Sequence, residues 1–298
     1  MILRIFPETP SGNLKKLADG IEYRRVQINH FLEHSMKTIR IGISGAAGRM
    51  GQRLIALGAA DGELEIVAAV EAEGHPKLGL DAGELCGIGK IDVPLTAELG
   101  PNVDVLIDFS SPEATDRIVA QCLERRTALV FATTGTTEQQ NRLLRDAATQ
   151  IPVLASPSMS MTVNLTMKLC ELAANILKDK DVDVEILERH HRFKADAPSG
   201  TALKFGKIIA AGMGQAVERH GREGQIGQRP HGEIGYHAVR IGDNPGEHSI
   251  LFGLVGETLE LTVKASNRDC YALGAFAAAK FLLGKPPGLY AMTDVLGL

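Results

Sequence analysis

The sequence contains no tryptophan, only 4% aromatic residues, and four cysteines in 298 residues. The cysteines lie far apart and form no CxxC pair, which argues against a disulfide framework and favours buried thiols in a reducing compartment. No apolar run approaches the roughly 20 residues of a membrane span, and the N-terminus lacks a signal-peptide core. Neither charge sign dominates, because 32 basic and 36 acidic residues give a net charge of −4. We therefore expect a cytoplasmic protein that binds neither membrane nor nucleic acid.

The length of the chain, 298 residues, exceeds what one hydrophobic core usually supports, so we expect two domains. Residues 1–35 show no sustained period and are interrupted by Pro7, Pro10 and Gly12. They are predicted to be an N-terminal extension of unknown role. Either the start codon is assigned upstream of the true start, or the extension is a genuine part of the protein.

From Met36 onward, segments of strand period alternate with segments of helix period. The predicted strands are 37–43, 65–70, 103–109, 128–132 and 153–155, and the predicted helices between them are 49–60, 113–125 and 138–149. This alternation is typical of βαβ units. It predicts an α/β fold with a Rossmann-like, doubly wound parallel sheet.

After residue 160 the pattern changes to that of an α+β domain with a mixed sheet. A long amphipathic helix is expected at 162–177, followed by strands at 183–188, 235–240, 248–254 and 258–265. The Ala/Leu-rich segment 271–283 is predicted to be a helix that packs back on the first domain. We therefore predict a dinucleotide-binding domain over 36–161 plus 269–298, and a substrate domain over 162–268.

Glycines recur every third residue, at 42, 45, 48 and 51, where the first strand should lead into a helix. Glycines there permit a tight turn and let backbone N–H groups approach a pyrophosphate at the helix N-terminus. An acidic residue, Glu71, closes the next predicted strand, where it could accept hydrogen bonds from the adenosine ribose. A purely structural glycine turn is the alternative. The predicted contacts to the dinucleotide are Gly45, Ala46, Ala47, Gly48, Arg49, Met50 and Glu71.

The residues after Glu71 bear on the choice of nicotinamide cofactor. Glu71 is followed by Ala72 and Glu73, and two carboxylates would repel the 2′-phosphate of NADPH. Nearby, His75 and Lys77 could offset this repulsion. We therefore expect NADH to be preferred over NADPH.

Two further strand ends carry polar turns, Asp108-Phe-Ser-Ser-Pro112 and Ala132-Thr-Thr-Gly135. Loops after parallel strands converge at the carboxyl edge of the sheet, where ligands bind in open α/β folds. Thr133 and Thr134 could therefore contact a nicotinamide ribose or carboxamide, with plain helix capping as the alternative.

The segment 188–202 concentrates imidazoles, fixed cations and a Ser-Gly-Thr turn. Read by itself, it predicts a site for a small anion, with His190 and Lys194 as proton donors and Arg192 or Thr201 as carboxylate holders. Ser199-Gly200-Thr201 could cap a helix over 202–211. A solvated basic loop is the alternative. A metal site is not expected, because Glu188 and Asp196 are the local candidates for a further ligand and no recognisable spacing joins them to the histidines.

Four motifs and their order carry a resemblance to a known family: Gly45-Ala-Ala-Gly-Arg-Met-Gly51, Asp108-Phe-Ser, Thr133-Thr-Gly135 and His190-His-Arg-Phe-Lys194-x-Asp-Ala-Pro-Ser-Gly-Thr201. From about Met36 to the C-terminus the chain resembles the dihydrodipicolinate reductases. The resemblance implies a Rossmann domain and a mixed-sheet domain that binds substrate and forms a homotetramer. It also implies hydride transfer from NAD(P)H in lysine and diaminopimelate biosynthesis, converting 4-hydroxy-tetrahydrodipicolinate to tetrahydrodipicolinate and water.

Carried over by position, the resemblance makes His190 a proton donor or acceptor and Lys194 the proton donor to the ring. The residues implied to hold the substrate carboxylates are His191, Gly200 and Thr201, with Ser199 and Arg192 beside them. Contacts to the nicotinamide half are implied for Ala132, Thr133, Thr134, Ser156, Pro157, Ser158 and Met159. The sequence departs from the family pattern at Phe193, often His, at Ala132, usually Gly, and at Ser158-Met159, usually Asn-Phe.

Two other functions are compatible with parts of the sequence. A different nicotinamide enzyme on the same fold, such as an amino-acid or semialdehyde dehydrogenase, would also need the glycine loop. A non-catalytic NAD(H) sensor would need the loop and Glu71 but would have no use for His190 and Lys194.

Overall fold

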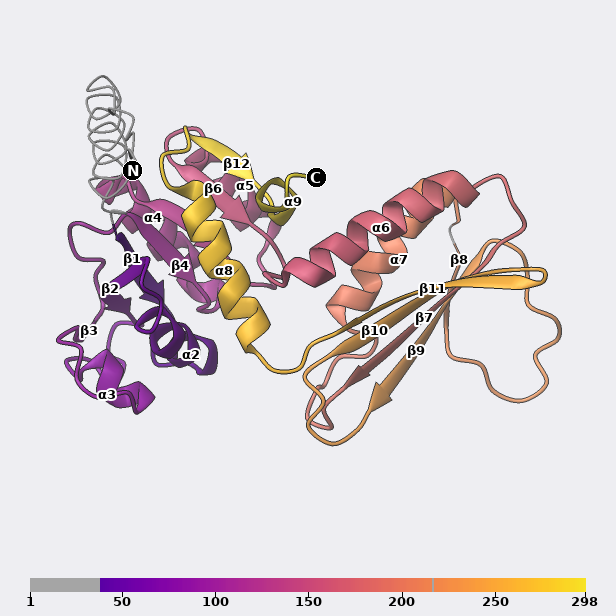
Figure 1. Cartoon of the computed structure of the whole chain (residues 1–298), viewed down its shortest axis with the longest axis horizontal. Helices are drawn as coiled ribbons and strands as arrows, with labels where there is room; N and C mark the ends of the chain where they lie inside the picture. The colour runs from indigo at the N-terminus through magenta and orange to yellow at the C-terminus, as the bar shows by residue number, and fades with distance from the viewer. Residues whose placement is uncertain (1–37, 216) are drawn as a thin grey trace, which may run out of the picture. The chain divides into compact units, whose positions relative to one another are not determined.

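The computed structural model describes residues 38–215 and 217–298, and the predicted extension over 1–35 lies outside the described residues. Residues Ile39–Leu298 form one compact unit. Its strands belong to two sheets, one of seven strands and one of five (Figure 1).

The seven-stranded sheet is parallel throughout, with the order β12-β6-β5-β4-β1-β2-β3. Its strands are β1 (Ile39–Ser44), β2 (Leu64–Val70), β3 (Leu95–Thr96), β4 (Val105–Asp108), β5 (Ala128–Phe131), β6 (Pro152–Ala155) and β12 (Gly288–Tyr290). The chain runs outward from β1 to β3 and then returns to β4 on the other side of β1. Ligands of open parallel sheets bind at the carboxyl edge beside such a reversal, so the topology locates the expected crevice next to β1 and β4.

Two apolar clusters flank this sheet. The helices around it are α2 (Arg49–Gly58), α3 (Ala82–Cys86), the short η1 (Pro112–Ala114), α4 (Thr115–Arg125), α5 (Glu138–Ala147), α8 (Asp269–Leu282) and α9 (Met292–Leu296). One cluster joins Ile41 and Ile43 to α2 and α8, and the other joins Leu129 to α4 and α5. Small residues let α8 approach closely, since a Cβ on Gly274 would lie 1.7 Å from the Met159 carbonyl oxygen.

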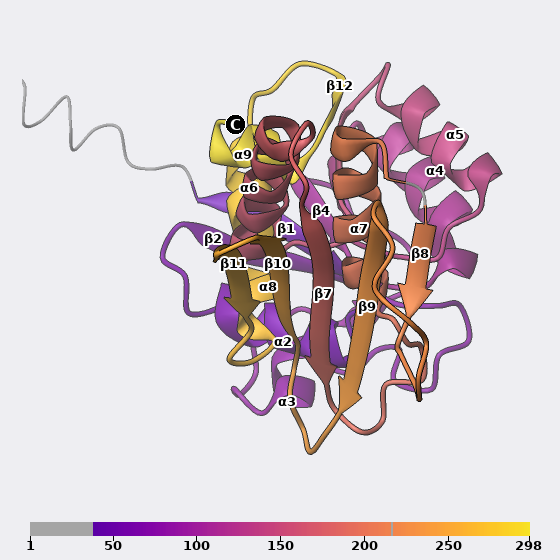
Figure 2. The same ribbon diagram turned by 90° about the vertical axis from the view of Figure 1, so that its right-hand side faces the viewer.

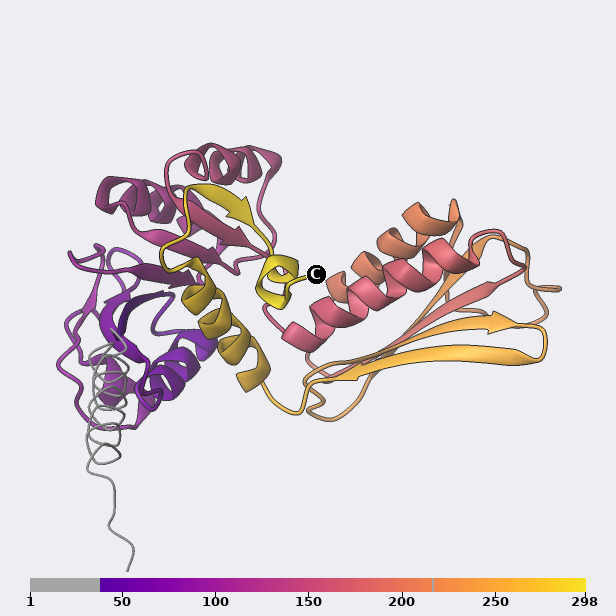
Figure 3. The same cartoon turned by 45° about the horizontal axis from the view of Figure 1, so that its top comes forward.

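The five-stranded sheet is mixed, with the order β11-β10-β7-β9-β8 (Figure 2). Its strands are β7 (Asp183–His190), β8 (Val217–His220), β9 (Glu233–Arg240), β10 (Glu247–Leu254) and β11 (Glu257–Lys264). The helices α6 (Met161–Leu177) and α7 (Gly200–Met213) lie on one face (Figure 3). Ile186, Phe205 and Phe252 are fully buried between that face and the two helices.

The predicted fold class is confirmed: a doubly wound parallel sheet is joined to a mixed-sheet α+β part. The long predicted elements are present within a few residues of their expected ends. Short elements were not predicted: α3, β3, β8, β12 and α9. β3 has only two residues, too few to show alternation, and all four residues of β8 are exposed, so it lacks the apolar residues that mark the buried four-residue strands. The domain boundaries at 161/162 and 268/269 stay predictions.

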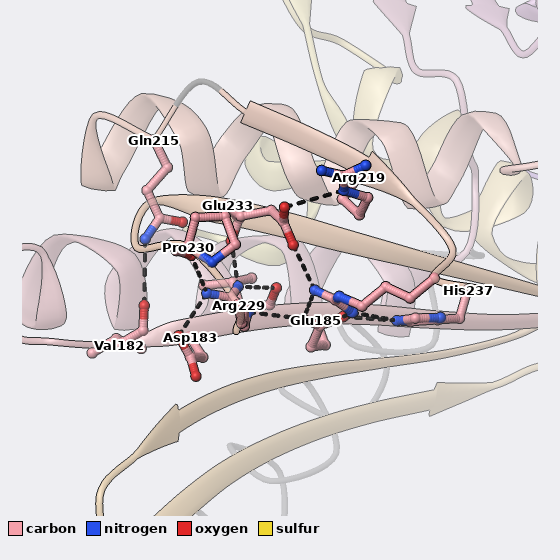
Figure 4. A network of polar contacts seen from close by, with 11 residues as sticks. Val182, Asp183, Glu185, Gln215, Arg219, Arg229, Pro230, Glu233 and His237 are labelled. Carbon is pink, nitrogen blue, oxygen red and sulfur yellow. Dashed lines mark hydrogen bonds and ion pairs between the residues drawn. The ribbon is translucent and has the colours of Figure 1, made fainter. Parts of the chain in front are cut away.

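Strand β7 presents different chemistry on its two faces because side chains alternate along a strand. Its even-numbered residues face α7, and Glu185 lies on the opposite face, within a network of charged side chains (Figure 4). Glu185 accepts hydrogen bonds from Arg222 (2.7 and 3.0 Å), Arg229 (3.1 Å) and His237 (2.7 Å). The network requires glycine at position 235, because a Cβ there would lie 1.9 Å from a Glu185 carboxylate oxygen.

We predict that Glu185→Gln makes stability less sensitive to acid. Burial opposes ionisation, but the hydrogen bonds from Arg222, His237 and Arg229 lower the pKa of Glu185 from 4.5 to about 2. A depressed pKa stabilises the fold above the unfolded-state pKa and loses that stabilisation as pH falls from 4.5 toward 2. In urea unfolding between neutral pH and about pH 3, the wild type should lose up to about 2 kcal/mol more than the variant.

The control for this experiment is Glu171→Gln, which removes an exposed carboxylate paired with Lys168 on α6. Exposed pairs contribute little, so its acid dependence should match that of the wild type. Equal acid dependence in Glu185→Gln and the wild type would show that the network does not stabilise the fold.

Candidate active site

The loop between β1 and α2 is shaped by two close backbone contacts. Gly45 has φ +73°, a left-handed conformation that favours glycine, and a Cβ there would lie 2.8 Å from the Phe109 carbonyl oxygen. A Cβ on Gly51 would lie 2.1 Å from the Gly45 carbonyl oxygen. The first turn of α2 can therefore rest directly on the loop. A larger residue at Gly51 would separate α2 from the loop, and one at Gly45 would push the loop away from Phe109.

The N-terminus of α2 is suited to an anion. Gly48 is the N-cap and supplies no side chain, and the first turn, Arg49 to Gln52, contains no acidic residue. The helix end therefore carries uncompensated partial positive charge. Arg49 also lines a shallow hollow of about 560 Å³ together with His191, Phe193 and Arg268.

Glu71 lies at the end of β2 and faces this loop. Its carboxylate accepts hydrogen bonds from the backbone N–H groups of Ala47 (3.0 Å) and Ala72 (3.0 Å). Arg117 donates to the Glu71 carbonyl oxygen (3.2 Å). Each carboxylate oxygen keeps a lone pair for a further donor, as recognition of a ribose hydroxyl requires.

Asp108 is fully buried at the end of β4 and organises three strand ends. It accepts hydrogen bonds from the hydroxyls of Ser110 (2.7 Å) and Thr133 (2.7 Å), and Ser44 also donates to it. Burial raises its pKa, and the hydroxyl donors oppose that rise. The Thr133 hydroxyl is therefore directed into the sheet rather than toward the crevice, which the sequence did not predict.

One pocket, of about 440 Å³, brings together most of the residues predicted for the nicotinamide half and for the substrate. From the loops after β5 and β6 it is lined by Ala132, Thr134, Pro157, Ser158 and Met159. From the segment after β7 it is lined by His190, His191, Lys194, Ser199, Gly200 and Thr201. A second cavity of about 450 Å³ shares His190, Thr201, Ser158 and Tyr271 with it.

Lys194, one of the two predicted proton donors, is paired with an exposed carboxylate. Its Nζ lies 2.8 Å from Asp196 Oδ1, and the hydrogen bond from Lys194 lowers the pKa of Asp196. An ammonium group has three protons, so pairing with Asp196 leaves donors that can serve the pocket.

His190 lies at the end of β7, and a buried carboxylate fixes its ring. Its Nδ1 is 2.5 Å from Glu188 Oε2, and Arg240 of β9 donates two hydrogen bonds to the same carboxylate (2.7 and 2.8 Å). Burial opposes ionisation, yet the hydrogen bonds from His190 and Arg240 lower the pKa of Glu188 to about 2. Sequence reasoning missed these partners, although the i, i+2 spacing of Glu188 and His190 puts them on one face of a strand.

Ser199 is the N-cap of α7 and is buried. Its hydroxyl oxygen accepts from the Ala202 N–H (3.1 Å) and lies 3.0 Å from His248 Nε2. Burial, and the charge of His190, lower the pKa of His248 to about 4, so at neutral pH a neutral imidazole is hydrogen-bonded to the Ser199 hydroxyl. The hydroxyl of Ser199 is thus occupied by structural contacts, and the expected helix cap is confirmed.

Some predicted site residues lie outside this pocket. The Arg192 side chain is exposed and its backbone N–H donates to the Gly242 carbonyl (3.1 Å). The Ser156 hydroxyl donates to the Ser158 carbonyl (2.8 Å). Ala46 and Met50 pack against the apolar cluster beside β1, so they can offer a ligand mainly backbone.

Within residues 38–215 and 217–298, no helix is long and apolar enough to cross a membrane. No group of three or more His, Cys, Asp or Glu side chains there is arranged to hold a metal ion.

A parallel sheet with a glycine loop at its reversal point, adjoining a pocket lined by an imidazole, a lysine and a helix N-terminus, defines a dinucleotide-dependent oxidoreductase. Residues 39–159 match the family model "Dihydrodipicolinate reductase, N-terminus", and residues 162–296 match "Dihydrodipicolinate reductase, C-terminus". The chain belongs to the dihydrodipicolinate reductase family. It is therefore an oxidoreductase of lysine and diaminopimelate biosynthesis, from a family that uses NAD(P)H.

The chain aligns with related proteins over nearly the whole length of those proteins. The chain is 52% identical to a 4-hydroxy-tetrahydrodipicolinate reductase of Rhodopirellula baltica, over 87% of this chain and 96% of the relative. It is 49% identical to the reductase of the same name from Alkalilimnicola ehrlichii, over 88% of this chain and 100% of the relative. Among solved structures, a dipicolinate-bound dihydrodipicolinate reductase from Paenisporosarcina superposes with a TM-score of 0.67 at 25% identity, covering 86% of this chain and 98% of that one.

We predict that Thr133→Val lowers stability but leaves dinucleotide affinity within about two-fold, because the lost hydroxyl serves Asp108 rather than the crevice. Removing a donor to a buried carboxylate should lower the free energy of unfolding by about 1–3 kcal/mol. Denaturant unfolding and NADH fluorescence titration measure the two effects. The matched control is Thr134→Val, whose exposed side chain lines the pocket and whose stability should change by less than about 0.5 kcal/mol. A large loss of NADH affinity in Thr133→Val would contradict the assignment.

Proposed function

We propose that this chain reduces a cyclic unsaturated imine dicarboxylate, formed from 4-hydroxy-tetrahydrodipicolinate by loss of water, to tetrahydrodipicolinate. The observation that carries the proposal is the single pocket in which the loops after β5 and β6 meet His190, Lys194 and the start of α7. A hydride acceptor in this pocket would lie between the nicotinamide side of the crevice and the proton donors. The names of the relatives support the choice of substrate.

The glycine loop fits a dinucleotide. A Cβ on Gly51 would collide with the Gly45 carbonyl oxygen. Glycine at both positions therefore keeps the loop thin enough for its N–H groups to approach a pyrophosphate. Residues 45–50 would hold the pyrophosphate, Glu71 the adenosine ribose, and residues 132–134 and 156–159 the nicotinamide half. The reduced dinucleotide, when bound, supplies the hydride.

The start of α7 is the proposed site for the substrate carboxylates. Gly200 and Thr201 of its first turn line the pocket, and this turn contains no acidic residue, so the helix end favours an anion. His191 lines the same pocket, and its buried Nδ1 has no hydrogen-bond partner within the described residues. A buried nitrogen without a partner is suited to a ligand that supplies one. Ser199 would act by capping this helix, and Arg192 from the rim of the site.

Protons are proposed to come from Lys194 and His190. As hydride reaches the ring carbon, negative charge develops on the ring nitrogen, and a lysine aimed at that nitrogen can donate its proton. Asp196 pairs with Lys194 and restrains its ammonium group. The imidazole of His190 lies in the same pocket and is the second group that could exchange a proton with the substrate.

We predict that Lys194→Ala lowers kcat at least about 100-fold while the Kd for NADH stays within about two-fold, because the proton donor is lost and the glycine loop is untouched. Stopped-flow NADH oxidation measures kcat, with the substrate made in situ from aspartate semialdehyde and pyruvate. Lys168→Ala, which removes an exposed lysine of α6, is the control and should keep wild-type turnover. Wild-type turnover in Lys194→Ala would refute the proposed role, and loss of NADH binding would show that Lys194 holds the cofactor.

The preference for NADH over NADPH is also a proposal. Glu71 is held at the end of β2 and is followed by exposed Ala72 and Glu73, so a 2′-phosphate would meet two carboxylates.

We predict that kcat/KM is at least about ten-fold higher with NADH than with NADPH, and that Ala72→Arg narrows this ratio by improving NADPH alone. Steady-state rates with both cofactors measure the ratio, and Ala60→Arg, an exposed position after α2, is the charge-matched control. Equal wild-type use of the two cofactors would contradict the preference.

We further propose that residues 36–161 and 269–298 form the dinucleotide-binding domain and that residues 162–268 form the substrate domain. The substrate domain is also proposed to hold four copies of the chain together as a homotetramer. The face of the mixed sheet opposite α6 and α7 supports this proposal, because no helix in the described part of the chain covers it (Figures 1 and 3). It combines apolar Leu187, Leu251 and Val239 with the Glu185 network shown in Figure 4. Sheet faces of this composition are usually buried between subunits.

A further inference from the structure

Glu188 is a buried carboxylate beside the pocket whose function the mechanism above leaves open. It is 1% exposed and lies two residues before His190, on the face of β7 that α7 covers. It does not line either of the two cavities that contain His190 in the described structure. Glu188 can therefore affect a substrate only through the groups that it contacts.

Four donors surround this carboxylate and use both of its oxygens. Oε2 receives His190 Nδ1 (2.5 Å) and one nitrogen of Arg240 (2.7 Å). Oε1 receives the other terminal nitrogen of Arg240 (2.8 Å) and the backbone N–H of Ser199 (3.0 Å). The carboxylate thus joins the imidazole, a fixed cation from β9 and the residue that caps α7.

These contacts determine the tautomer of His190. Because the pKa of Glu188 is about 2, it is ionised at neutral pH and can only accept hydrogen bonds. The proton of a neutral His190 must therefore reside on Nδ1, which leaves Nε2 free to exchange a proton. Gly246 keeps space open there, since a Cβ at that position would lie 3.1 Å from Nε2.

We propose that Glu188 is a positioning residue for the reduction: it holds His190 in the Nδ1–H tautomer and, through the Ser199 N–H, holds the start of α7 in register with that imidazole. The inference rests on the proposed function, which assigns the proton to His190 and the carboxylate site to α7. One carboxylate then couples the proton-handling group to the anion-holding turn. Arg240 keeps that carboxylate charged and oriented.

Glu185, also on β7, provides a matched control for this proposal. Glu185, on the opposite face, also accepts four hydrogen bonds, from Arg222, Arg229 and His237, and its pKa is also about 2. It contacts no residue of the pocket described above. Substitution of Glu185 and of Glu188 should therefore disturb the fold to a similar extent and differ in their effect on the reaction.

The test compares Glu188→Gln with Glu185→Gln in the full-length protein, at concentrations where both have the wild-type assembly mass. We expect Glu188→Gln to lower kcat about 100-fold and to raise KM for the dicarboxylate several-fold, with NADH affinity within two-fold. Glu185→Gln should keep kcat within about three-fold at a comparable loss of thermal stability. Equal kcat in the two variants would overturn the proposal.

A second measurement reads the tautomer of His190 directly in the wild-type protein. Nitrogen-15 NMR of histidine-labelled wild-type protein reports which ring nitrogen of His190 carries the proton, with the signal assigned by its loss in His190→Gln. We expect the Nδ1–H tautomer in the wild type, and the Nε2–H form or a mixture in Glu188→Gln, because a glutamine amide can donate as well as accept. The Nε2–H tautomer in the wild type would overturn the proposal.

The outcomes separate this inference from the proposed function. If Lys194→Ala is inactive while Glu188→Gln turns over like the wild type, the reduction stands and the positioning role fails. If Lys194→Ala and Glu188→Gln both keep wild-type turnover, the assignment of the pocket itself is wrong. Glu188→Asp keeps the negative charge on a shorter side chain, so its kcat should lie between those of Glu188→Gln and the wild type. A general loss of stability would not produce this order of kcat values.

Discussion

A carboxyl group buried at a strand end costs free energy unless hydrogen-bond donors satisfy its oxygens, and this constraint shapes both halves of the protein. At the end of β4, Asp108 collects the hydroxyls of Ser44, Ser110 and Thr133. Near the end of β7, Glu188 collects His190, Arg240 and the Ser199 N–H. Each carboxylate thereby fixes the loops that border the pocket, so the pocket is held by groups that do not line it.

Charge is distributed along the crevice in a way that suits a dinucleotide and a dicarboxylate. The start of α2 and the start of α7 are both helix N-termini without acidic first turns, and both can take anions. Glu71 and Glu73 add negative charge only near the ribose end of the loop. Lys194 and His190 lie at the other end, inside the pocket. An anionic substrate is therefore attracted to the end where protons are available.

Much of this arrangement was predictable because it depends on local pattern. The glycine spacing, the acidic residue that closes β2 and the Ser-Gly-Thr cap of α7 each require only neighbouring residues, and the elements that carry them are present. The short elements α3, β3, β8, β12 and α9 depend on pairing or packing with distant segments, so they carry no strong period. Arg240 and His248 reach the site from β9 and β10, and no spacing in the sequence links them to His190.

The sequence by itself determined the fold class, the glycine loop, the family and the segment that carries the proposed proton donors, since alternation of apolar residues and short motifs encode these locally. Only the tertiary structure decided which polar groups meet. It directed the Thr133 hydroxyl into Asp108, occupied the Ser199 hydroxyl with a helix cap and His248, left Arg192 exposed, and closed Arg240 onto Glu188. The physical reason is that a buried polar atom must find a partner in space, and that partner is chosen by the packing of strands far apart in the chain.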